Sequence, residues 1–344
     1  MSSYHKDFQL NGISFSSSEE MITFSQSISS ELTGFLRDWF SDDSLVCVKT
    51  SGSTGVPKNI HLQKTSMEQS AQATATFFDL PPKTTALCCL PVDFIAGKMM
   101  LVRALTQGWY LDIIMPDSTP LKNVCHSYDF SAMVPLQLSN SLDKIHLIKK
   151  LIVGGGEVSS QLEQSINQIK TEVFATYGMT ETITHIAIKP LNGINQTSNY
   201  QVLPNVKIDI DHRNCLVIKA PGISSNKIIT NDIVELISET EFVWKGRFDN
   251  VINSGGIKLH PEVIEKKIGT KISRRFFVAG IPDKKLEKKL ILLIEGDQYL
   301  IKNEEVFSEL SKFEIPKEIF FIERFIETKT KKIQRLKTLG LLGT

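Results

Sequence analysis

The stretch Val46–His61, VCVKTSGSTGVPKNIH, organises the rest of the chain. A β-rich run leads into a segment of serine, threonine and glycine, which ends at Pro57 and Lys58. Glycines allow successive N–H groups to point at one anion, the hydroxyls add donors, and the lysine adds positive charge. Such a loop can bind phosphate, although a turn joining two strands has the same composition. It is not a Walker A loop, because proline stands where that motif requires glycine. The candidate phosphate ligands are Thr50, Ser51, Gly52, Ser53, Thr54, Gly55 and Lys58.

The composition is that of a globular protein. A chain of 344 residues can bury a substantial core and divide into two or more domains. Its 39 Lys and Arg against 38 Asp and Glu give a net charge of +1, which argues against a broad nucleic-acid surface. Five cysteines without CxxC spacing argue against a disulfide framework or a zinc site. We find no signal-peptide pattern and no run approaching a membrane span, so we expect a soluble, cytoplasmic protein.

Strands alternate with helices in the first half of the chain. An amphipathic helix is expected over residues 19–40. Further helices are expected over 66–78, 96–107 and 158–170, and strands over 85–90, 110–115, 147–153 and 172–176. This alternation predicts an α/β fold with a mostly parallel sheet covered on both sides. Ligands bind at the carboxyl ends of such strands, where residues 154–157 and 177–181 fall.

The pattern changes after about residue 189. Short alternating strands separated by turns predict a small antiparallel, barrel-like β subdomain over about 190–248. From residue 249 a mixture of short helices and strands predicts a compact α+β domain of about a hundred residues. We therefore expect an N-terminal domain over 1–248 and a small C-terminal domain over 249–344.

The loop matches TSGSTGxPK, the phosphate-loop signature of the adenylate-forming superfamily of acyl-CoA synthetases, luciferases and peptide-synthetase adenylation domains. The segment 177–182, YGMTET, resembles the family motif YGxTE. The resemblance implies that Tyr177, followed by Gly178, stacks on adenine, that Thr180 contacts the α-phosphate, and that Glu181 holds Mg²⁺. From the residues alone, the segment would be a polar turn after a core strand. A second glycine-rich segment resembles the one that lies along adenine and the acyl pocket, or is a simple strand-to-helix turn: Gly154, Gly155, Gly156 and Glu157.

Three later segments resemble further family motifs. Thr230-Asn231-Asp232 is similar to TGD, whose aspartate, here Asp232, accepts hydrogen bonds from the ribose hydroxyls. The segment GRFD matches GRxD, which implies that Arg247 reaches the nucleotide and that Asp249 is the hinge between the domains. In SGGIKLHPEV the resemblance implies that Gly255, Gly256 and Lys258 line the path of the thiol. In KKIQR it selects Lys332 as the catalytic lysine.

The sequence also departs from the family pattern. Phe94 stands where relatives often carry histidine, and Ala175 stands where a polar residue often precedes the tyrosine by two. Lys331 replaces a glycine, which affects the expected loop conformation beside Lys332. Only 49 residues precede Thr50, fewer than in full-length relatives.

The resemblance implies an ATP-dependent acid–thiol ligase that forms an acyl-adenylate and pyrophosphate, then a thioester, with ATP, Mg²⁺ and coenzyme A. The stretches LPVDFIAGKMMLVRAL and YGMTETITHIA resemble ligases that act on o-succinylbenzoate in menaquinone biosynthesis. Lys98, Arg103 and His185 are candidates for the second carboxylate of such a substrate, or are structural. Three alternatives stay open: a ligase for another aryl or short acyl acid, an adenylation domain that loads a carrier protein, and a binding module without activity. The oligomeric state cannot be deduced.

Overall fold

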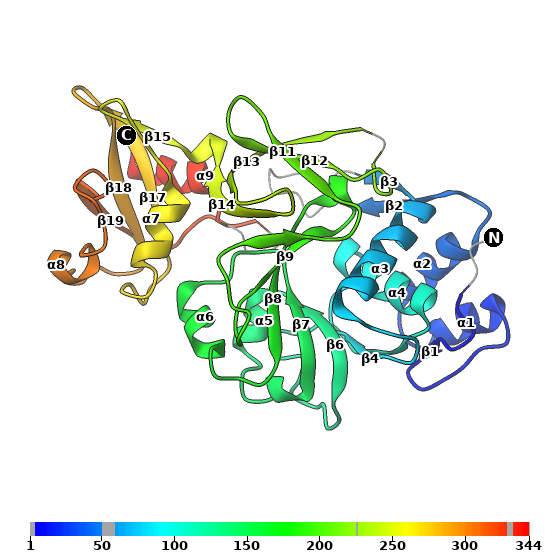
Figure 1. The fold of residues 1–344 in the computed structure, drawn as a ribbon. Coiled ribbons are helices and arrows are strands. Elements are labelled where there is room, and N and C mark those ends of the chain that lie inside the picture. Colours follow the sequence, from blue (N-terminus) through cyan, green and yellow to red (C-terminus); the bar gives the residue numbers. More distant parts are fainter. Residues whose placement is uncertain (1–3, 50–58, 225, 329–332, 344) are drawn as a thin grey trace.

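The structure is a computed structural model that describes residues 4–49, 59–224, 226–328 and 333–343. Within these ranges the strands form a twelve-stranded sheet, a five-stranded sheet and a two-stranded hairpin. The large sheet lies in the middle of the molecule, and the small sheet lies beyond one of its ends (Figure 1). The α/β fold with a large and a small part, expected from the sequence, is confirmed.

The first part of the large sheet is parallel. Its neighbouring strands run in the order β1-β5-β4-β6-β7-β8. Their bounds are β1 Gln9–Leu10, β4 Thr85–Cys88, β5 Tyr110–Ile113, β6 Tyr128–Met133, β7 Ile148–Val153 and β8 Glu172–Gly178. The carboxyl ends of β7 and β8 are therefore adjacent, as ligand binding in an α/β sheet requires.

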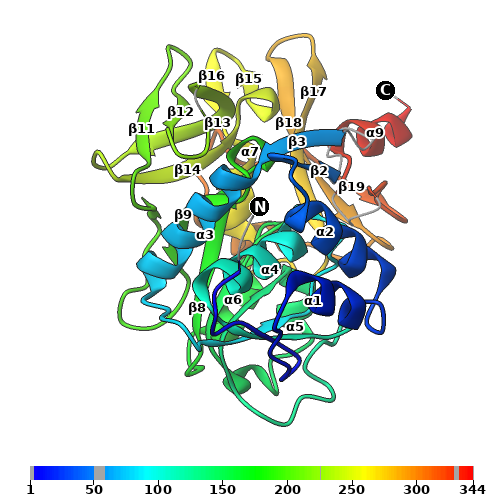
Figure 2. The same ribbon diagram turned by 90° about the vertical axis from the view of Figure 1, so that its right-hand side faces the viewer.

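Both faces of this parallel part are buried. Along β4 and the residue after it, Ala86 and Cys88 join one core while Leu87 and Cys89 join the other, because successive side chains point to opposite faces. The first core is closed by helices α3, Lys64–Phe78, and α4, Ile95–Gln107, and the second by α5, Pro135–Ser139, and α6, Ser160–Ile166. Figure 2 shows α3 and α4 in front of the sheet.

The second part of the large sheet is antiparallel. It continues from β8 in the order β9-β10-β14-β13-β12-β11. Their bounds are β9 His185–Pro190, β10 Tyr200–Val202, β11 Lys207–Ile210, β12 Cys215–Lys219, β13 Ile228–Leu236 and β14 Glu241–Arg247. The expected antiparallel strands are present, but they extend the parallel sheet instead of forming a separate barrel. The reason is that β9 pairs with the open edge of β8 and β10 then pairs with β9.

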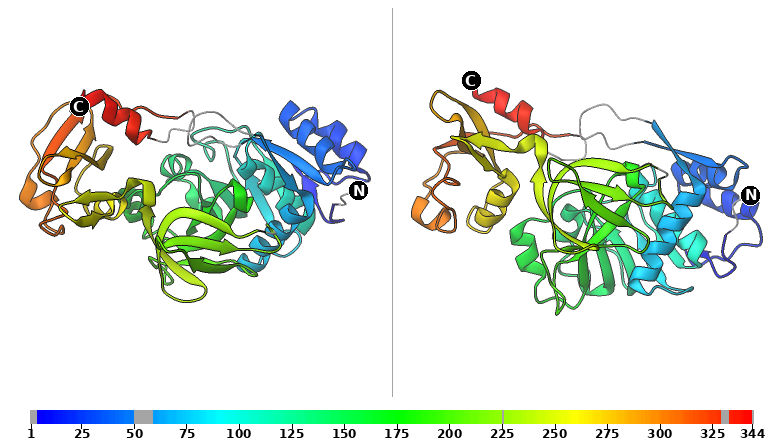
Figure 3. Two further views of the ribbon diagram at one scale, coloured as in Figure 1. Left: turned by 90° about the horizontal axis from the view of Figure 1, so that it is seen from above. Right: turned by 45° about the horizontal axis from the view of Figure 1, so that its top comes forward.

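The C-terminal part has its own sheet and core. Its strands are β15 Ile252–Ser254, β16 Ile257–Leu259, β17 Phe276–Asp283, β18 Glu287–Glu295 and β19 Glu318–Ile322. Its helices are α7 Pro261–Ile268, α8 Asn303–Val306 and α9 Arg335–Leu339. The turn Phe248–Asn250 joins the two sheets. Seen from above, this part and the N-terminal helices lie at opposite ends of the molecule (Figure 3).

The N-terminal region differs from the expected single helix over 19–40. It contains two helices, α1 Ser18–Ser25 and α2 Ser30–Phe40. The Ser29 hydroxyl accepts a hydrogen bond from the Leu32 N–H at 3.1 Å, which caps α2 and starts a new helix. The hairpin strands β2, Leu45–Lys49, and β3, Asn59–Gln63, flank the organising loop. In the described residues, none of the helices is both long and apolar enough to cross a membrane.

Candidate active site

Two of the sequence-predicted segments meet at the carboxyl ends of β7 and β8. Gly154 follows β7, and a Cβ atom on it would lie 2.4 Å from the Thr176 Oγ1 of β8. That hydroxyl donates to the Val153 carbonyl at 3.1 Å. Glycine at 154 is therefore required for the two strand ends to approach so closely.

Tyr177 contacts Asp232, which comes from the antiparallel part of the sheet. The Tyr177 hydroxyl donates to Asp232 Oδ2 at 2.7 Å, and the Asp232 residue is 6% exposed. The tyrosine ring packs edge-on against Tyr200 and Phe242. Burial raises the pKa of Tyr177, and the charge of Asp232 and the hydrogen bond to it add to the effect. The structure thus brings together the predicted adenine-stacking and ribose-binding residues, 55 positions apart.

A residue that sequence reasoning missed completes this contact. The Trp244 indole Nε1 donates to Asp232 Oδ1 at 3.2 Å. Both carboxylate oxygens of Asp232 are thereby hydrogen-bonded. No sequence motif pointed to Trp244, because its position depends on an irregularity in β14.

Arg247 lies between the Asp232 carboxylate and Asp249. Arg247 Nη1 is 3.8 Å from Asp232 Oδ1, and Arg247 Nη2 is 3.4 Å from Asp249 Oδ2. The Asn231 side-chain amide also donates to Asp249 Oδ2, at 3.3 Å. The candidate hinge residue is therefore linked to both predicted nucleotide-binding segments, and Arg213 Nη1 holds the Asn231 oxygen at 2.9 Å.

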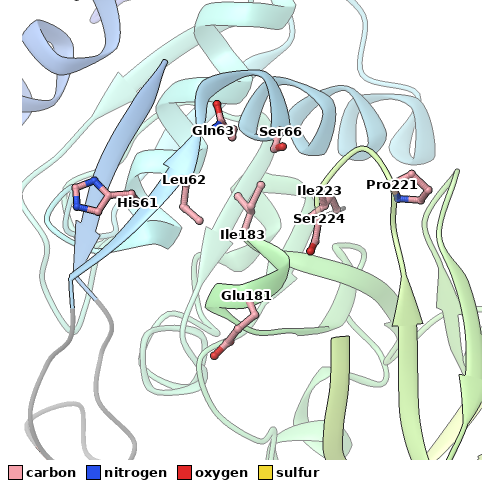
Figure 4. Close-up of a pocket in the computed structure, with 9 residues that line it drawn as sticks. All are labelled: His61, Leu62, Gln63, Ser66, Glu181, Ile183, Pro221, Ile223 and Ser224. Atoms are coloured by element: carbon pink, nitrogen blue, oxygen red, sulfur yellow. The ribbon is translucent and has the colours of Figure 1, made fainter. Parts of the chain in front are cut away.

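Glu181 lines a cavity of about 390 Å³ (Figure 4). It extends from the short helical turn Thr180–Thr182 that follows β8. Strand β3, the start of α3, the residue after the turn Thr180–Thr182 and the loop after β12 supply the other walls: His61, Leu62, Gln63, Ser66, Ile183, Pro221, Ile223 and Ser224. A carboxylate, two serines and apolar side chains thus line one space, while the His61 ring points away from the other lining residues (Figure 4).

Ile183 in this cavity has a strained backbone. Its φ is +65° and its ψ −59°, and the Thr184 N–H donates to the Thr182 carbonyl at 2.7 Å. This is a γ-turn of the rare kind, which costs a β-branched residue of order 1–3 kcal/mol. This turn bends the chain sharply after Glu181 and directs Thr184 and His185 into the core.

Arg103 and His185 form a buried polar cluster next to the cavity. Arg103 is 1% and His185 4% exposed. Arg103 Nε donates to Thr74 Oγ1 at 3.3 Å and Nη2 to Thr184 Oγ1 at 3.4 Å, while His185 contacts the same two hydroxyls at 3.3 Å. Among the described residues, none of the ion pairs joins Arg103 to a carboxylate.

The pKa values of this cluster follow from its burial. Burial lowers the pKa of Arg103 to about 10, so the guanidinium is still charged at neutral pH. Burial and the charge of Arg103 hold the pKa of His185 well below its ordinary value, so the imidazole is neutral. The cluster therefore carries one positive charge inside the protein.

Lys98, the third candidate for a substrate carboxylate, points elsewhere. It lies on α4 with Arg103, but its Nζ is 5.1 Å from the ring centre of Phe35 on α2. Phe94, at the family's histidine position, is the residue before α4 and is 38% exposed.

The Gly255-Gly256 turn lies in the small sheet. It joins β15 to β16, and both glycines have positive φ, +57° and +80°. A two-residue hairpin loop with positive φ at both positions favours glycine, so the local conformation explains this pair. Lys258 follows on β16 and is exposed.

Glu157 faces carboxylates of α7 across the boundary between the two parts. It is exposed, but the surrounding protein removes water from its carboxylate, and Glu265 and Glu262 repel it, which raises its pKa to about 7. Arg335 opposes the repulsion through a bidentate pair with Glu265, with both N–O distances 2.7 Å. Water still screens part of the repulsion on Glu157.

The organising loop and the candidate catalytic lysine belong to the part of the chain that the structure does not describe. Eight predicted site residues lie outside the described residues: Thr50, Ser51, Gly52, Ser53, Thr54, Gly55, Lys58 and Lys332. The roles expected for them stay predictions.

Comparison with protein families gives the class of the protein. The family described as "AMP-binding enzyme" matches residues 16–222, more than half of the chain. The chain therefore belongs to the AMP-binding enzyme family, the adenylate-forming acid–CoA ligases. The superfamily resemblance of the sequence motifs is confirmed.

Two individual relatives match most of the chain. The 2-succinylbenzoate–CoA ligase of Listeria monocytogenes serovar 1/2a is 26% identical over 334 residues, covering 88% of this chain and 71% of that protein. The crystal structure of an acyl-CoA synthetase (AMP-forming)/AMP-acid ligase II-like protein from Dyadobacter fermentans is 36% identical, with a TM-score of 0.63, over 91% of this chain and 94% of that one.

One solved structure is similar in fold at lower identity. The O-succinylbenzoate coenzyme A synthetase of Bacillus subtilis, in complex with ATP and magnesium ion, has a TM-score of 0.73 at 20% identity, over 85% of this chain and 69% of that one. This likeness supports the fold.

Proposed function

We propose that this chain is an o-succinylbenzoate–CoA ligase that uses ATP, Mg²⁺ and coenzyme A in menaquinone biosynthesis. A carboxylate of the acid attacks the α-phosphorus of ATP, giving the acyl-adenylate and pyrophosphate. The thiol of coenzyme A then attacks the acyl carbon, giving the thioester and AMP. The 2-succinylbenzoate–CoA ligases among the relatives support this substrate over other acids.

The residues around Asp232 fit a nucleotide. The Tyr177 ring supplies a surface for the adenine, and the Asp232 carboxylate accepts hydrogen bonds from the ribose. A carboxylate has about four acceptor sites, so the two protein donors leave room for two hydroxyls. Arg247 stands close enough to reach the same nucleotide.

Glu181 would hold Mg²⁺. In the part of the chain that is described, three or more acidic, histidine or cysteine groups nowhere cluster as a metal site. This fits Mg²⁺ bound to a nucleotide, which takes one or two carboxylates and completes its shell with phosphate oxygens and water. The bound ion would neutralise charge that develops on the phosphates, and Lys332 would add a second positive charge there.

The observation that carries the choice of acid is the buried charge of Arg103. Burying a guanidinium without a carboxylate partner costs several kcal/mol, so such a charge is kept where an anion arrives. A second carboxylate of the acid would supply the missing partner. The neutral His185 and the hydroxyls of Thr74 and Thr184 would hold the guanidinium in place until the acid binds.

The second half-reaction rests on the small sheet. We assign Gly255, Gly256 and Lys258 to the path of the thiol, and Asp249 to the hinge between residues 1–248 and 249–344. Glycine at a turn lets the backbone pass close to a narrow ligand. The hydrogen bonds of Asp249 to Arg247 and Asn231 link the hinge to the nucleotide site. A movement at Asp249 would therefore change contacts in both parts of the chain.

Pyrophosphate exchange across a panel of acids, with and without coenzyme A, tests this proposal. We expect exchange with o-succinylbenzoate, and thioester only when coenzyme A is added. Exchange without a free thioester would indicate loading of a carrier protein, and exchange with a different aryl or short acyl acid would change the substrate. Failure of every acid to support exchange would overturn the proposal in favour of a binding module.

A further inference from the structure

Trp244 is distinguished from the other tryptophans of the chain by its hydrogen bond. The sequence has three tryptophans. The indole nitrogens of Trp39 and Trp109 are buried without a hydrogen-bond partner in the described residues. Trp244, in contrast, donates to a carboxylate whose side chain is only 8% exposed.

A bulge in β14 brings the Trp244 side chain to Asp232. Strands β13 and β14 pair Asp232 with Arg247 and Ile233 with Gly246, but then Val234 with Trp244, which skips Lys245. Opposed residues of an antiparallel pair share a face, and residues 232 and 234 share one because the side-chain period is two. Trp244 therefore lies on the face of Asp232. Without the extra residue it would oppose Glu235 and point to the other face.

Gly246 makes this bulge possible. Its φ is +127°, a conformation that residues with a side chain rarely adopt. A Cβ atom at this position would lie 2.3 Å from Glu262 Oε2 on α7. The irregularity that directs Trp244 is thus fixed both by the backbone and by contact with the C-terminal part.

From this geometry we infer that Trp244 is a positioning residue for the nucleotide ribose. Its indole N–H and the Tyr177 hydroxyl each hold one oxygen of Asp232, so the carboxylate cannot rotate and presents its free acceptor sites in one direction. The inference rests on the proposed ribose contact of Asp232. Losing a hydrogen bond to a charged group weakens the interaction by about tenfold.

The first test is Trp244→Phe, assayed with ATP and with 2′,3′-dideoxy-ATP in pyrophosphate exchange. The dideoxy nucleotide lacks the hydroxyls that Asp232 would bind. We expect KM for ATP to rise about tenfold with kcat changed less than twofold, and KM for the dideoxy nucleotide to stay the same. An equal loss for both nucleotides would show a structural role and overturn the inference.

A second variant removes only the N–H group and keeps the shape of the side chain. All three tryptophans are replaced by the benzothiophene analogue, in which sulfur stands for the indole nitrogen. Because the N–H groups of Trp39 and Trp109 have no hydrogen-bond partner among the described residues, the bond to Asp232 is the one described indole bond that is lost. We expect the preference for ATP over the dideoxy nucleotide to fall about tenfold, and an unchanged preference would refute the role of Trp244. If the unmodified chain binds ATP without distinguishing it from the dideoxy nucleotide, the ribose contact and the inference both fail. If it binds neither, the proposed function fails as well.

Discussion

The substitution Arg103→Met removes a buried charge that has no carboxylate partner among the ion pairs of the described residues. The lowered pKa of about 10 means that the charged form costs the folded protein about 3 kcal/mol. The folded state binds this proton less tightly than the unfolded chain, so the cost is fully present below pH 10 and is relieved as the pH rises above it. An experiment near pH 7.5 therefore measures the whole cost.

The substitution also loses two long hydrogen bonds, to Thr74 and Thr184, each worth about 1 kcal/mol. Methionine fills much of the volume of the arginine stem, so the cavity left is small. We expect the free energy of unfolding to rise by about 1 kcal/mol, with Tm up by a few degrees at most. Replacing most other buried polar residues lowers the free energy of unfolding.

Activity should change in the opposite sense to stability. A hydrogen bond between charged groups contributes about 1.5–3 kcal/mol, so Arg103→Met should reduce kcat/KM for o-succinylbenzoate about 10- to 100-fold. The assay compares o-succinylbenzoate with 4-oxo-4-phenylbutanoate and 2-butanoylbenzoate, which each lack one of its carboxylates. The variant should no longer prefer the diacid over whichever monoacid the unmodified protein still activates.

Lys150→Met is the matched control. Lys150 is a half-buried cation whose Nζ donates to the Phe78 carbonyl at 2.7 Å, away from the cavity. Its loss should not raise stability and should leave the preference between acids unchanged. Arg103→Met that is destabilised by several kcal/mol and still prefers the diacid would refute the role of Arg103.

Three other changes test separate parts of the site. Lys332→Ala should slow adenylation by up to about a thousandfold yet leave thioester formation from supplied acyl-adenylate largely intact, and equal loss of both steps would refute the two-step assignment. Gly246→Ala should destabilise the chain by at least 1–3 kcal/mol in chemical unfolding, because of its positive φ and the clash with Glu262, whereas Gly340→Ala, with open space around it, should have little effect. The folded pKa of Glu157 is about 7, above its ordinary 4.5, so the free energy of unfolding should fall as the pH rises between these values. Glu157→Gln should reduce that slope in pH-dependent unfolding. An identical slope would show that the carboxylates repel too weakly to matter.

The alternation of strands and helices could be predicted because its strands are long apolar runs. The expectations for β4, β7 and β8 are confirmed by the structure. Strand β6, Tyr128–Met133, was missed, since Asp129 and Ser131 interrupt its apolar pattern. Those polar side chains are satisfied by the neighbouring strand, where Asp129 accepts from Thr85 and Ser131 donates to the Leu87 carbonyl. Partners this distant in sequence cannot be deduced from a local pattern.

The candidate site divides in the same way. The family motifs YGxTE and TGD predicted that Tyr177 and Asp232 belong to one site, because each of these short segments is recognisable by itself. Trp244 gave no signal, since its direction depends on a bulge of one residue that pairing with β13 creates. The sequence around Arg103 gave only a weak signal, because the apolar residues of α4 fit a core helix equally well. Nothing in the neighbouring sequence shows whether a carboxylate lies opposite the guanidinium.

The boundary between the two sheets is held by an unfavourable set of charges. Glu157 from the large part faces Glu262 and Glu265 of α7, and the charges of Arg335 and Lys189 oppose the repulsion. The hydrogen bonds from α6 across this boundary are long: Ser160 Oγ to the Lys266 carbonyl and Gln161 Nε2 to the Ile272 carbonyl are both 3.4 Å. Long hydrogen bonds contribute little, and like charges at a half-exposed boundary cost some of what they contribute. The repulsion at this boundary therefore favours other arrangements of the two parts, which is what our proposal of a small, mobile domain serving adenylation and thioester formation in turn requires.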